Sequence, residues 1–297
     1  MERERHVPVL LQDAIRYLNV RRGGTYVDAT LGLAGHSSAI ARLLGPGGTL
    51  IAFDRDPDAM ELAKPRLDAL RAELGSEMPK VILHSTEFSE AEDLIEQGSL
   101  DGLLADFGVS SLQFDEAHRG FSFQADGPLD MRMNPRVGLT AAQVVNQFGE
   151  KELADLIYEF GEERRSRRIA RAIVRARPVS TTAQLARVVS AAAPAMKSER
   201  IHPATRTFQA LRIYVNQELG QIEALLKVAP KLLRKSGRLV VISFHSLEDR
   251  IAKDALREGG QQGIYEVLTR KPVTAGEEET DRNPRARSAK LRAAEKK

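Results

Sequence analysis

A loop rich in small residues follows the first apolar segment of the chain, with the sequence DATLGLAGH at residues 28–36. Ligands of open α/β sheets bind at the carboxyl ends of strands, and small residues there let backbone N–H groups approach a ligand. Gly32 and Gly35 are spaced G-x-x-G, so the G-x-G-x-x-G fingerprint of dinucleotide binding is not met. Because Asp28 would repel a pyrophosphate and attract an ammonium group, the loop favours S-adenosylmethionine (SAM), which has a methionyl group and no phosphate. The alternative is a tight glycine turn beside a solvated acid.

Two further acidic residues end predicted strands. Asp54 stands where a carboxylate accepts hydrogen bonds from ribose hydroxyls. Asp106 and Phe107 stand where methyltransferases acting on exocyclic amines place an acceptor for the amino hydrogens and an aromatic ring against the base. The lone pair of such an amine is delocalised into the ring, so positioning it is the main catalytic task. The alternative is that Asp106 only caps a strand, since the D/N-P-P-aromatic pattern of many amino-methyltransferases is absent.

Histidine and cysteine usage narrows the chemistry further. His245 follows the fifth predicted strand, where it could shuttle a proton, contact RNA or serve a structural role. The chain has no cysteine, which excludes cysteine–zinc sites and the thiolate route to cytosine C5 methylation. We expect no metal site, because none of the histidines has metal-ligand spacing; they are His6, His36, His84, His118, His202 and His245.

Basic residues are concentrated in the second half of the chain. Residues 1–150 have 14 Lys and Arg against 23 Asp and Glu, a net charge of −9, whereas residues 151–297 have 30 against 18, a net charge of +12. This asymmetry predicts a nucleic-acid partner for the second half, the alternative being solvated helices. With only 10 Phe, 5 Tyr and no Trp for base stacking, we expect recognition of the RNA backbone.

The basic segments are residues 163–177, residues 200–206 and a C-terminal tail, residues 282–297. On a helix the arginines of the first segment spread over more than one face, so we expect some to pair with acidic neighbours and others to meet phosphates. The arginines assigned to RNA contact are Arg164, Arg165, Arg167, Arg168, Arg206, Arg285 and Arg287.

The elements that position these residues follow an α/β pattern. Short apolar runs alternate with helical patterns in the first half, which is typical of βαβ units and a parallel sheet. Strands are predicted at residues 25–29, 49–53, 80–84 and 100–106, with helices at residues 36–44 and 57–74. The strand pattern returns at residues 237–244, 264–269 and 286–293.

Between these strands lies a segment of different character. A loop-rich stretch at residues 110–138 precedes helical patterns at residues 141–148, 151–160, 163–177, 183–193 and 207–228. Two helices have the spacing of a capping box, Thr140 with Gln143 and Thr181 with Gln184. We therefore expect a helical domain of residues 113–213 inserted into a discontinuous domain of residues 1–112 and 214–297.

Length and composition exclude several classes of protein. A chain of 297 residues can bury a core without disulfides or metal. No stretch approaches the roughly 20 apolar residues of a membrane span, and the charged start of the chain, residues 1–6, lacks the apolar region of a signal peptide. We expect a soluble, cytoplasmic protein that acts as a monomer or a homodimer, and no membrane partner.

Longer motifs carry a resemblance that covers essentially the whole chain. They are DATLGLAGH at residues 28–36, FDRDP at 53–57, DFGVSSLQ at 106–113, RGFSF at 119–123, GPLDMRM at 127–133, HPATRTFQALRI at 202–213, ISFHSLEDR at 242–250 and NPRARSAKLR at 283–292. In these motifs the chain resembles the MraW-type 16S rRNA methyltransferases.

The resemblance implies a class I SAM-dependent methyltransferase with an inserted helical domain. It implies methylation of N4 of a cytidine in the decoding region of bacterial 16S rRNA, within the small ribosomal subunit or a late assembly intermediate. The implied cofactor contacts are Ala34, Gly35, His36, Asp54, Phe88, Asp106 and Gln113, beside the Asp28 and Gly32 found above.

One position departs from the family pattern, and two other functions stay open. The family usually has Gly-Gly-His where this chain has Ala34-Gly35-His36, and we expect Ala34 in an ordinary backbone conformation. The alternatives are a ribosome-assembly or RNA-binding factor in which SAM is only a structural ligand, and a SAM enzyme acting on DNA or a small molecule.

Overall fold

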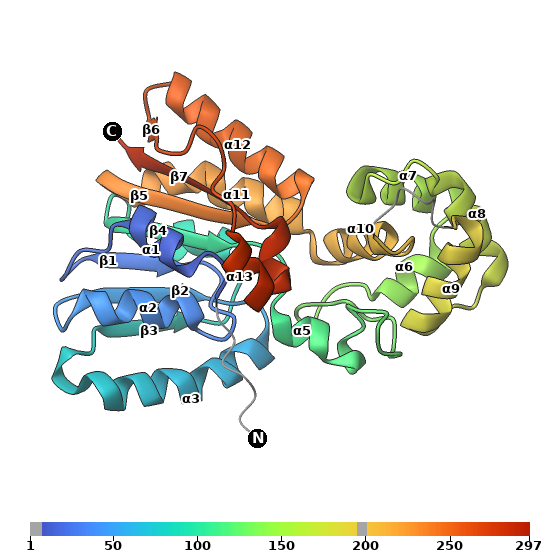
Figure 1. Cartoon of the computed structure of the whole chain (residues 1–297), viewed down its shortest axis with the longest axis horizontal. Helices are drawn as coiled ribbons and strands as arrows, with labels where there is room; N and C mark the ends of the chain where they lie inside the picture. The colour runs from blue at the N-terminus through green and yellow to red at the C-terminus, as the bar shows by residue number, and fades with distance from the viewer. Residues whose placement is uncertain (1–7, 195–200) are drawn as a thin grey trace. The chain divides into compact units, whose positions relative to one another are not determined.

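The computed structural model describes residues 8–194 and 201–297, which form two compact units (Figure 1). Unit 1 comprises residues up to Gly108 and from Leu219 onward, and unit 2 comprises Val109–Glu218. His6 and Arg200, which the sequence places in its histidine set and in a basic segment, lie outside the described residues. Of the helices described, none is both long and apolar enough to cross a membrane.

Unit 1 is built on a seven-stranded sheet. The strands are β1 (Thr25–Asp28), β2 (Thr49–Phe53), β3 (Lys80–His84), β4 (Leu100–Asp106), β5 (Leu233–Ser243), β6 (Tyr265–Val267) and β7 (Lys290–Lys296). Their order is β3-β2-β1-β4-β5-β7-β6. The first five run parallel, whereas β7 is antiparallel to both β5 and β6. The parallel strands agree with the alternating pattern, and the whole order is that of the class I SAM-dependent methyltransferase fold that the resemblance implies.

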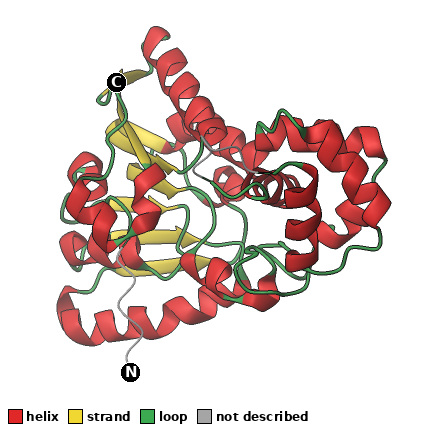
Figure 2. Ribbon diagram, turned by 45° about the vertical axis from the view of Figure 1, so that its right-hand side comes forward, coloured by secondary structure: helices red, strands yellow, loops and turns green. Residues whose placement is uncertain are grey.

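Helices cover both faces of this sheet (Figure 2). One face packs against α1 (Leu11–Leu18), α2 (Gly35–Leu44) and α3 (Pro57–Leu74). The other packs against α4 (Ala91–Leu94), α11 (Glu218–Leu232) and α12 (Ser246–Gln261). Successive residues of β2 alternate between the two cores, Leu50 and Ala52 facing one while Ile51 and Phe53 face the other. Burial on both faces explains why the strands appear in the sequence as continuous apolar runs.

Unit 2 is helical and has its own hydrophobic core. It contains α5 (Ser111–Asp115), α6 (Ala141–Gln147), α7 (Glu150–Gly161), α8 (Ser166–Ala176), α9 (Thr182–Ala192) and α10 (Thr205–Asn216). The capping box of Thr140 and Gln143 is present. The one expected at Thr181 is only half formed, because the Gln184 side chain accepts from the Ser180 N–H and not from Thr181.

The predicted helix at residues 207–228 is wrong as a single element. Gln217 has a left-handed backbone (φ 50°, ψ 36°) and separates α10 from α11. A hydrophobic pattern that runs through both helices hides this break, since a single left-handed residue leaves no strong mark in the sequence. The break falls at the boundary between the two units.

The C-terminal segment also differs from its prediction as a basic tail. Residues Pro284–Ser288 form a 3-10 helix, so the strand predicted at residues 286–293 begins later, as β7 at Lys290–Lys296. β7 lies between β5 and β6 in the sheet. Arg292 is buried and its Nε lies 2.7 Å from Asp249 Oδ1, while Lys290 Nζ lies 3.2 Å from Asp249 Oδ2. Two of the seven basic residues of this segment therefore share one carboxylate of the same unit.

Candidate functional site

The carboxyl ends of three adjacent strands bring acidic residues to one edge of the sheet. Asp28 ends β1, Asp54 follows β2 and Asp106 ends β4. The strands are neighbours in the order β2-β1-β4 and run parallel, with Asp28 in register with Ala52 and Leu104. The juxtaposition expected from the sequence is thus a direct result of the topology.

Asp28 is completely buried and holds the loop that follows it. Its Oδ2 accepts a hydrogen bond from Ser37 Oγ at 2.6 Å, and its Oδ1 accepts one from the Thr30 N–H at 3.1 Å. Burial raises the pKa of this carboxyl to about 6, against the hydrogen bonds from Ser37 and Thr30, which lower it. The sequence suggested a carboxylate open to a ligand, whereas the side chain is directed into the loop.

Asp54 is half-buried and ties the loop to β2. The Gly32 N–H donates to its Oδ2 at 2.8 Å, and the Asp56 N–H donates to its Oδ1 at 2.8 Å. Burial raises the pKa of Asp54 to about 6 despite these hydrogen bonds. Each carboxylate oxygen can accept a second hydrogen bond, so Asp54 keeps the capacity to bind a pair of hydroxyls.

The backbone conformation of Ala34, in the loop between β1 and α2, differs from the ordinary conformation expected. Ala34 is left-handed, with φ 57° and ψ 32°, and immediately precedes α2. A left-handed conformation costs a residue with a Cβ about 1–2 kcal/mol, so the surrounding contacts must hold it. Gly35 has no room for a side chain, because a Cβ there would lie 2.3 Å from Pro8 Cγ. The segment before α1 therefore packs directly on the start of α2.

Asp106 lies at the centre of this edge and faces His36. Its Oδ2 is 3.7 Å from His36 Nδ1, and its own backbone N–H donates to Thr30 Oγ1 at 2.7 Å. The other oxygen, Oδ1, is buried and has no hydrogen-bond partner among the described residues. Burial, with the charges of Asp28 and Glu248 as further causes, raises the pKa of Asp106 well above its ordinary value. A buried acceptor without a partner is costly unless a ligand supplies the donor.

Two aromatic rings lie beside this acidic edge. Phe88 is half-buried in the 3-10 helix Phe88–Glu90, and its ring centroid is 6.3 Å from that of Phe107. Phe107 is only 2% exposed and belongs to the core on the α11 face of the sheet. Phe244 is also half-buried, and its ring lies close to Gly108. Phe107, the ring expected to lie against the base, is thus less accessible than Phe244.

His245 has a structural role at the start of α12. Its Nδ1 accepts a hydrogen bond from the Glu248 N–H at 3.4 Å, and the Glu248 carboxylate accepts from the His245 N–H, which together make a capping box. Glu248 is completely buried, and its Oε2 also accepts from the Phe244 N–H at 2.7 Å. The helix α12 and its cap were not foreseen, although the spacing of His245 and Glu248 resembles a capping box with histidine in place of serine.

Gln113 belongs to unit 2 and is nearly buried there, with 4% of its surface exposed. Its Oε1 accepts a hydrogen bond from the Ser110 N–H at 3.0 Å. In this position it fixes the turn before α5.

The arginines of the basic segment at residues 163–177 fall into two groups. Arg165 and Arg177 are half-buried and bind backbone carbonyls, Arg165 at Pro194 and Arg177 at Val145 and Phe148. The second group is exposed on α8 and the turn before it; its members are Arg164, Arg167, Arg168, Arg171 and Arg175. Among them, Arg171 Nε lies 3.3 Å from Glu150 Oε1. The prediction that some arginines pair while others face solvent is confirmed, but Arg165 is among the paired ones.

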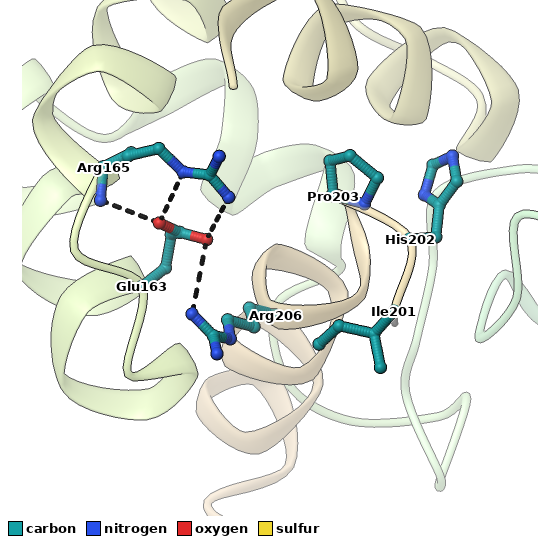
Figure 3. Close-up of a pocket in the computed structure, with 6 residues that line it drawn as sticks. All are labelled: Glu163, Arg165, Ile201, His202, Pro203 and Arg206. Carbon is teal, nitrogen blue, oxygen red and sulfur yellow. Dashed lines mark hydrogen bonds and ion pairs between the residues drawn. The ribbon is translucent and has the colours of Figure 1, made fainter. Parts of the chain in front are cut away.

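Glu163 binds Arg165 and Arg206 at the wall of a pocket on unit 2 (Figure 3). The carboxylate of Glu163, 1% exposed, accepts from the Arg165 N–H at 2.8 Å and Nε at 3.1 Å. Arg206 Nη1 lies 3.9 Å from the other carboxylate oxygen. Burial would raise the pKa of Glu163, but the hydrogen bonds from Arg165 outweigh it and lower the pKa. The predicted helix at residues 163–177 accordingly begins only at Ser166.

Arg285 and Arg287 are exposed in the 3-10 helix of unit 1.

Sequence reasoning did not identify the buried Glu248, the Thr30 hydroxyl or the Pro8–Val9 segment as parts of the acidic edge. Their places in the site depend on long-range packing, and only Glu248 carries a local signal, its capping-box spacing from His245.

Comparison with known proteins gives a consistent result over the whole chain. The model of the MraW methylase family matches residues 3–297. A protein from Acidobacterium capsulatum named ribosomal RNA small subunit methyltransferase H is 98% identical over 297 residues, covering 100% of both chains. Proteins of the same name from Koribacter versatilis and Solibacter usitatus are 62% and 50% identical, covering 100% and 98% of this chain and 96% and 99% of their own lengths.

Proposed function

The chain belongs to the MraW methylase family, and from this premise we propose that it transfers a methyl group from SAM to N4 of a cytidine in the decoding region of 16S rRNA. The coarser activity, methylation of small-subunit rRNA, is supported by relatives whose names state it and which match over their full lengths. The position on the RNA is the finer part of the proposal.

The observation that carries the proposal is the buried Oδ1 of Asp106, which has no hydrogen-bond partner in the part of the chain that the structure describes. It lies at the carboxyl end of β4, where the ligands of open α/β sheets bind. An exocyclic amine offers two N–H donors, and one of them would supply the hydrogen bond that this oxygen lacks. Asp106 therefore suits a donor group such as an exocyclic amine.

The residues at this edge also fit SAM, which supplies an electrophilic methyl group and carries positive charge when bound. Asp54 would hold the ribose hydroxyls, because both of its oxygens retain acceptor capacity beside Gly32. The carboxyl groups of Asp28, Asp54 and Asp106 gather at this edge, which disfavours a pyrophosphate, and the cationic part of SAM would favour their ionised forms. Phe88, half-buried beside this edge, would pack against the adenine.

The protein's contribution to the reaction is then mainly positioning. Asp106 would accept an N–H of the amine and fix the direction of the nitrogen, while Phe244 or Phe107 would pack on the base. Holding two reactants in line supplies a large part of the rate enhancement, up to about 7–11 kcal/mol in well-oriented systems. No covalent adduct is needed, which agrees with the absence of cysteine.

Unit 2 would supply RNA contacts through its exposed arginines. Arg164, Arg167 and Arg168 are exposed near the start of α8, and Arg206 is 42% exposed beside Glu163. Guanidinium groups bind phosphates in two-pronged geometry, and a partner carboxylate that fixes a guanidinium reduces the entropy lost on binding. Arg285 and Arg287 of unit 1 remain candidates for the same role. We place this activity in the cytoplasm, where small subunits are assembled.

The test is transfer of labelled methyl from SAM to small ribosomal subunits whose 16S rRNA lacks the modification, followed by nuclease digestion and mass mapping. Free 16S rRNA, assembled subunits and DNA are compared as substrates. Label at N4 of a decoding-region cytidine supports the proposal. Label on DNA or at another rRNA position contradicts it, and measurable SAM binding without any transfer favours an assembly factor that uses SAM as a structural ligand.

A further inference from the structure

Asp106 and His36 form a close pair of titratable groups from different elements. Asp106 ends β4 and His36 lies in the first turn of α2, with 3.7 Å between Oδ2 and Nδ1. The His36 side chain is 5% exposed and that of Asp106 is 23% exposed. The other charged groups that face Asp106 are Asp28 on β1 and Glu248 on α12, both carboxyl groups and both buried. His36 is thus the group in this cluster that can carry positive charge or accept a proton without adding negative charge.

The backbone fixes which nitrogen of His36 faces Asp106. His36 Nε2 lies 3.1 Å from the carbonyl oxygen of Val9. Because a carbonyl only accepts hydrogen bonds, Nε2 carries the hydrogen in the neutral ring and Nδ1 holds the lone pair. The contact between Pro8 and Gly35 keeps this segment against the start of α2. The lone pair of the neutral ring therefore faces the carboxyl group of Asp106.

We propose that His36 and Asp106 act as one base, which accepts the proton that the amine loses on methylation and then holds it between the two side chains. This inference rests on the proposed function. As the amine nitrogen bonds to the methyl carbon, the bond from that carbon to the sulfur of SAM breaks and its electrons stay on sulfur. One N–H bond of the amine then breaks, its electrons stay on nitrogen, and the proton forms an O–H bond at Asp106 Oδ1. His36 Nδ1 faces the other oxygen, Oδ2, at 3.7 Å, so a proton that the carboxyl group carries on Oδ2 can pass to His36 once the two atoms approach to hydrogen-bond distance. The pair changes from a net charge of −1 to 0, and the proton leaves to water after the product.

The electrostatics of the site suit this role. A general base works best when its pKa lies near the working pH, and an ordinary aspartate is too weak a base. Burial and the neighbouring carboxylates raise the pKa of Asp106, which strengthens it as a base. His36 is then a positioning residue, since it acts through Asp106 and stabilises the protonated state of the pair.

The direct test measures the protonation of the His36–Asp106 pair in the absence of any reaction. In protein with 15N-labelled histidine, long-range 1H–15N spectra report the tautomer and protonation of each ring as a function of pH. His36 is assigned by the signal that disappears in His36→Gln. We expect the neutral ring to carry its hydrogen on Nε2, and Asp106→Asn to lower the pH midpoint of His36 protonation by about one unit because the carboxylate that stabilises the imidazolium is lost. A ring with hydrogen on Nδ1, or identical titration curves in both proteins, overturns the proposal.

The second test separates this inference from the proposed function. In His36→Gln the side-chain amide can still donate to Val9, so we expect the start of α2 to keep its structure and kcat, measured at saturating SAM, to be at least about ten-fold lower. The midpoint of the rate against pH moves to lower pH, because the pair has lost one of the two atoms that can hold its proton. His118→Gln, at a side chain that is 70% exposed in unit 2, is the matched control and keeps normal kinetics.

The outcomes are distinguishable. If wild-type protein does not methylate small subunits at all, the proposed function fails and with it the catalytic role of the pair. If wild type is active and His36→Gln keeps its kcat and pH profile, only the pair is refuted. Since Asp106→Asn and His36→Gln are read separately, failure of one variant to fold leaves the other to decide.

Discussion

Replacing Asp28 by asparagine should remove a pH-dependent cost of folding. Burial raises the pKa of Asp28 to about 6 from an ordinary value of 3.8. Because the folded pKa lies above the unfolded one, the folded protein binds the proton more tightly, so this contribution to stability is complete below pH 3.8 and is lost as the pH rises through 6. A difference of about two units, at about 1.4 kcal/mol per unit, corresponds to about 3 kcal/mol.

Asparagine does not titrate, so the Asp28→Asn variant does not lose this contribution to stability as the pH rises. The difference in unfolding free energy, variant minus wild type, should therefore increase by up to about 3 kcal/mol between pH 4 and pH 7. Loss of the Asp28 charge also lowers the pKa of Asp106, which acts in the same direction. Hydrogen exchange of amides in β1 and β4 measures the stability of unit 1 separately from that of unit 2. A difference between the two proteins that does not change with pH would refute the reasoning that burial of Asp28 sets its pKa.

Three further predictions concern unit 2. Gln217→Gly should stabilise unit 2 by about 1 kcal/mol, because glycine adopts the left-handed conformation of this exposed residue without strain. Gln217→Val should destabilise unit 2, because a β-branched residue is strained there. Amide exchange in α10 measures both effects, and exchange that slows in the valine variant or quickens in the glycine variant would contradict the prediction. Glu163→Gln should destabilise unit 2 by about 1–3 kcal/mol, since two guanidinium groups lose their buried carboxylate, and an unchanged unfolding free energy would contradict this. The double variant of Arg164→Ala and Arg168→Ala should lower the slope of log K against log salt for small-subunit RNA by about 2, while Arg71→Ala, exposed on α3, should leave it unchanged.

The sequence predicts the sheet of unit 1 well because each strand is buried on both faces. The bounds of β2, α3, β3 and β4 agree with the predicted ranges, since apolar runs with glycine, proline and aspartate at their ends leave little choice. The strand-end acids follow from these bounds. What the sequence could not supply are features set by single residues in unusual conformations or by contacts between distant segments.

Ala34 and Arg165 illustrate these limits. Ala34 is left-handed because the loop is held by Asp28 and Asp54, and alanine itself gives no signal of it. Arg165 has the same residue type and spacing as its exposed neighbours, but its guanidinium is bound to a buried carboxylate and to a backbone carbonyl. Burial and hydrogen bonding separate structural arginines from those available to RNA, and both are properties of the folded chain.

The most direct test of the account compares wild type with Asp106→Ala on the same unmodified small subunits, with SAM affinity measured in both proteins. The account predicts N4-methylcytidine in the decoding region with wild type, and loss of turnover in the variant that exceeds any loss of SAM binding. Full methylation by Asp106→Ala would contradict it, since the acceptor that carries the assignment would then be dispensable.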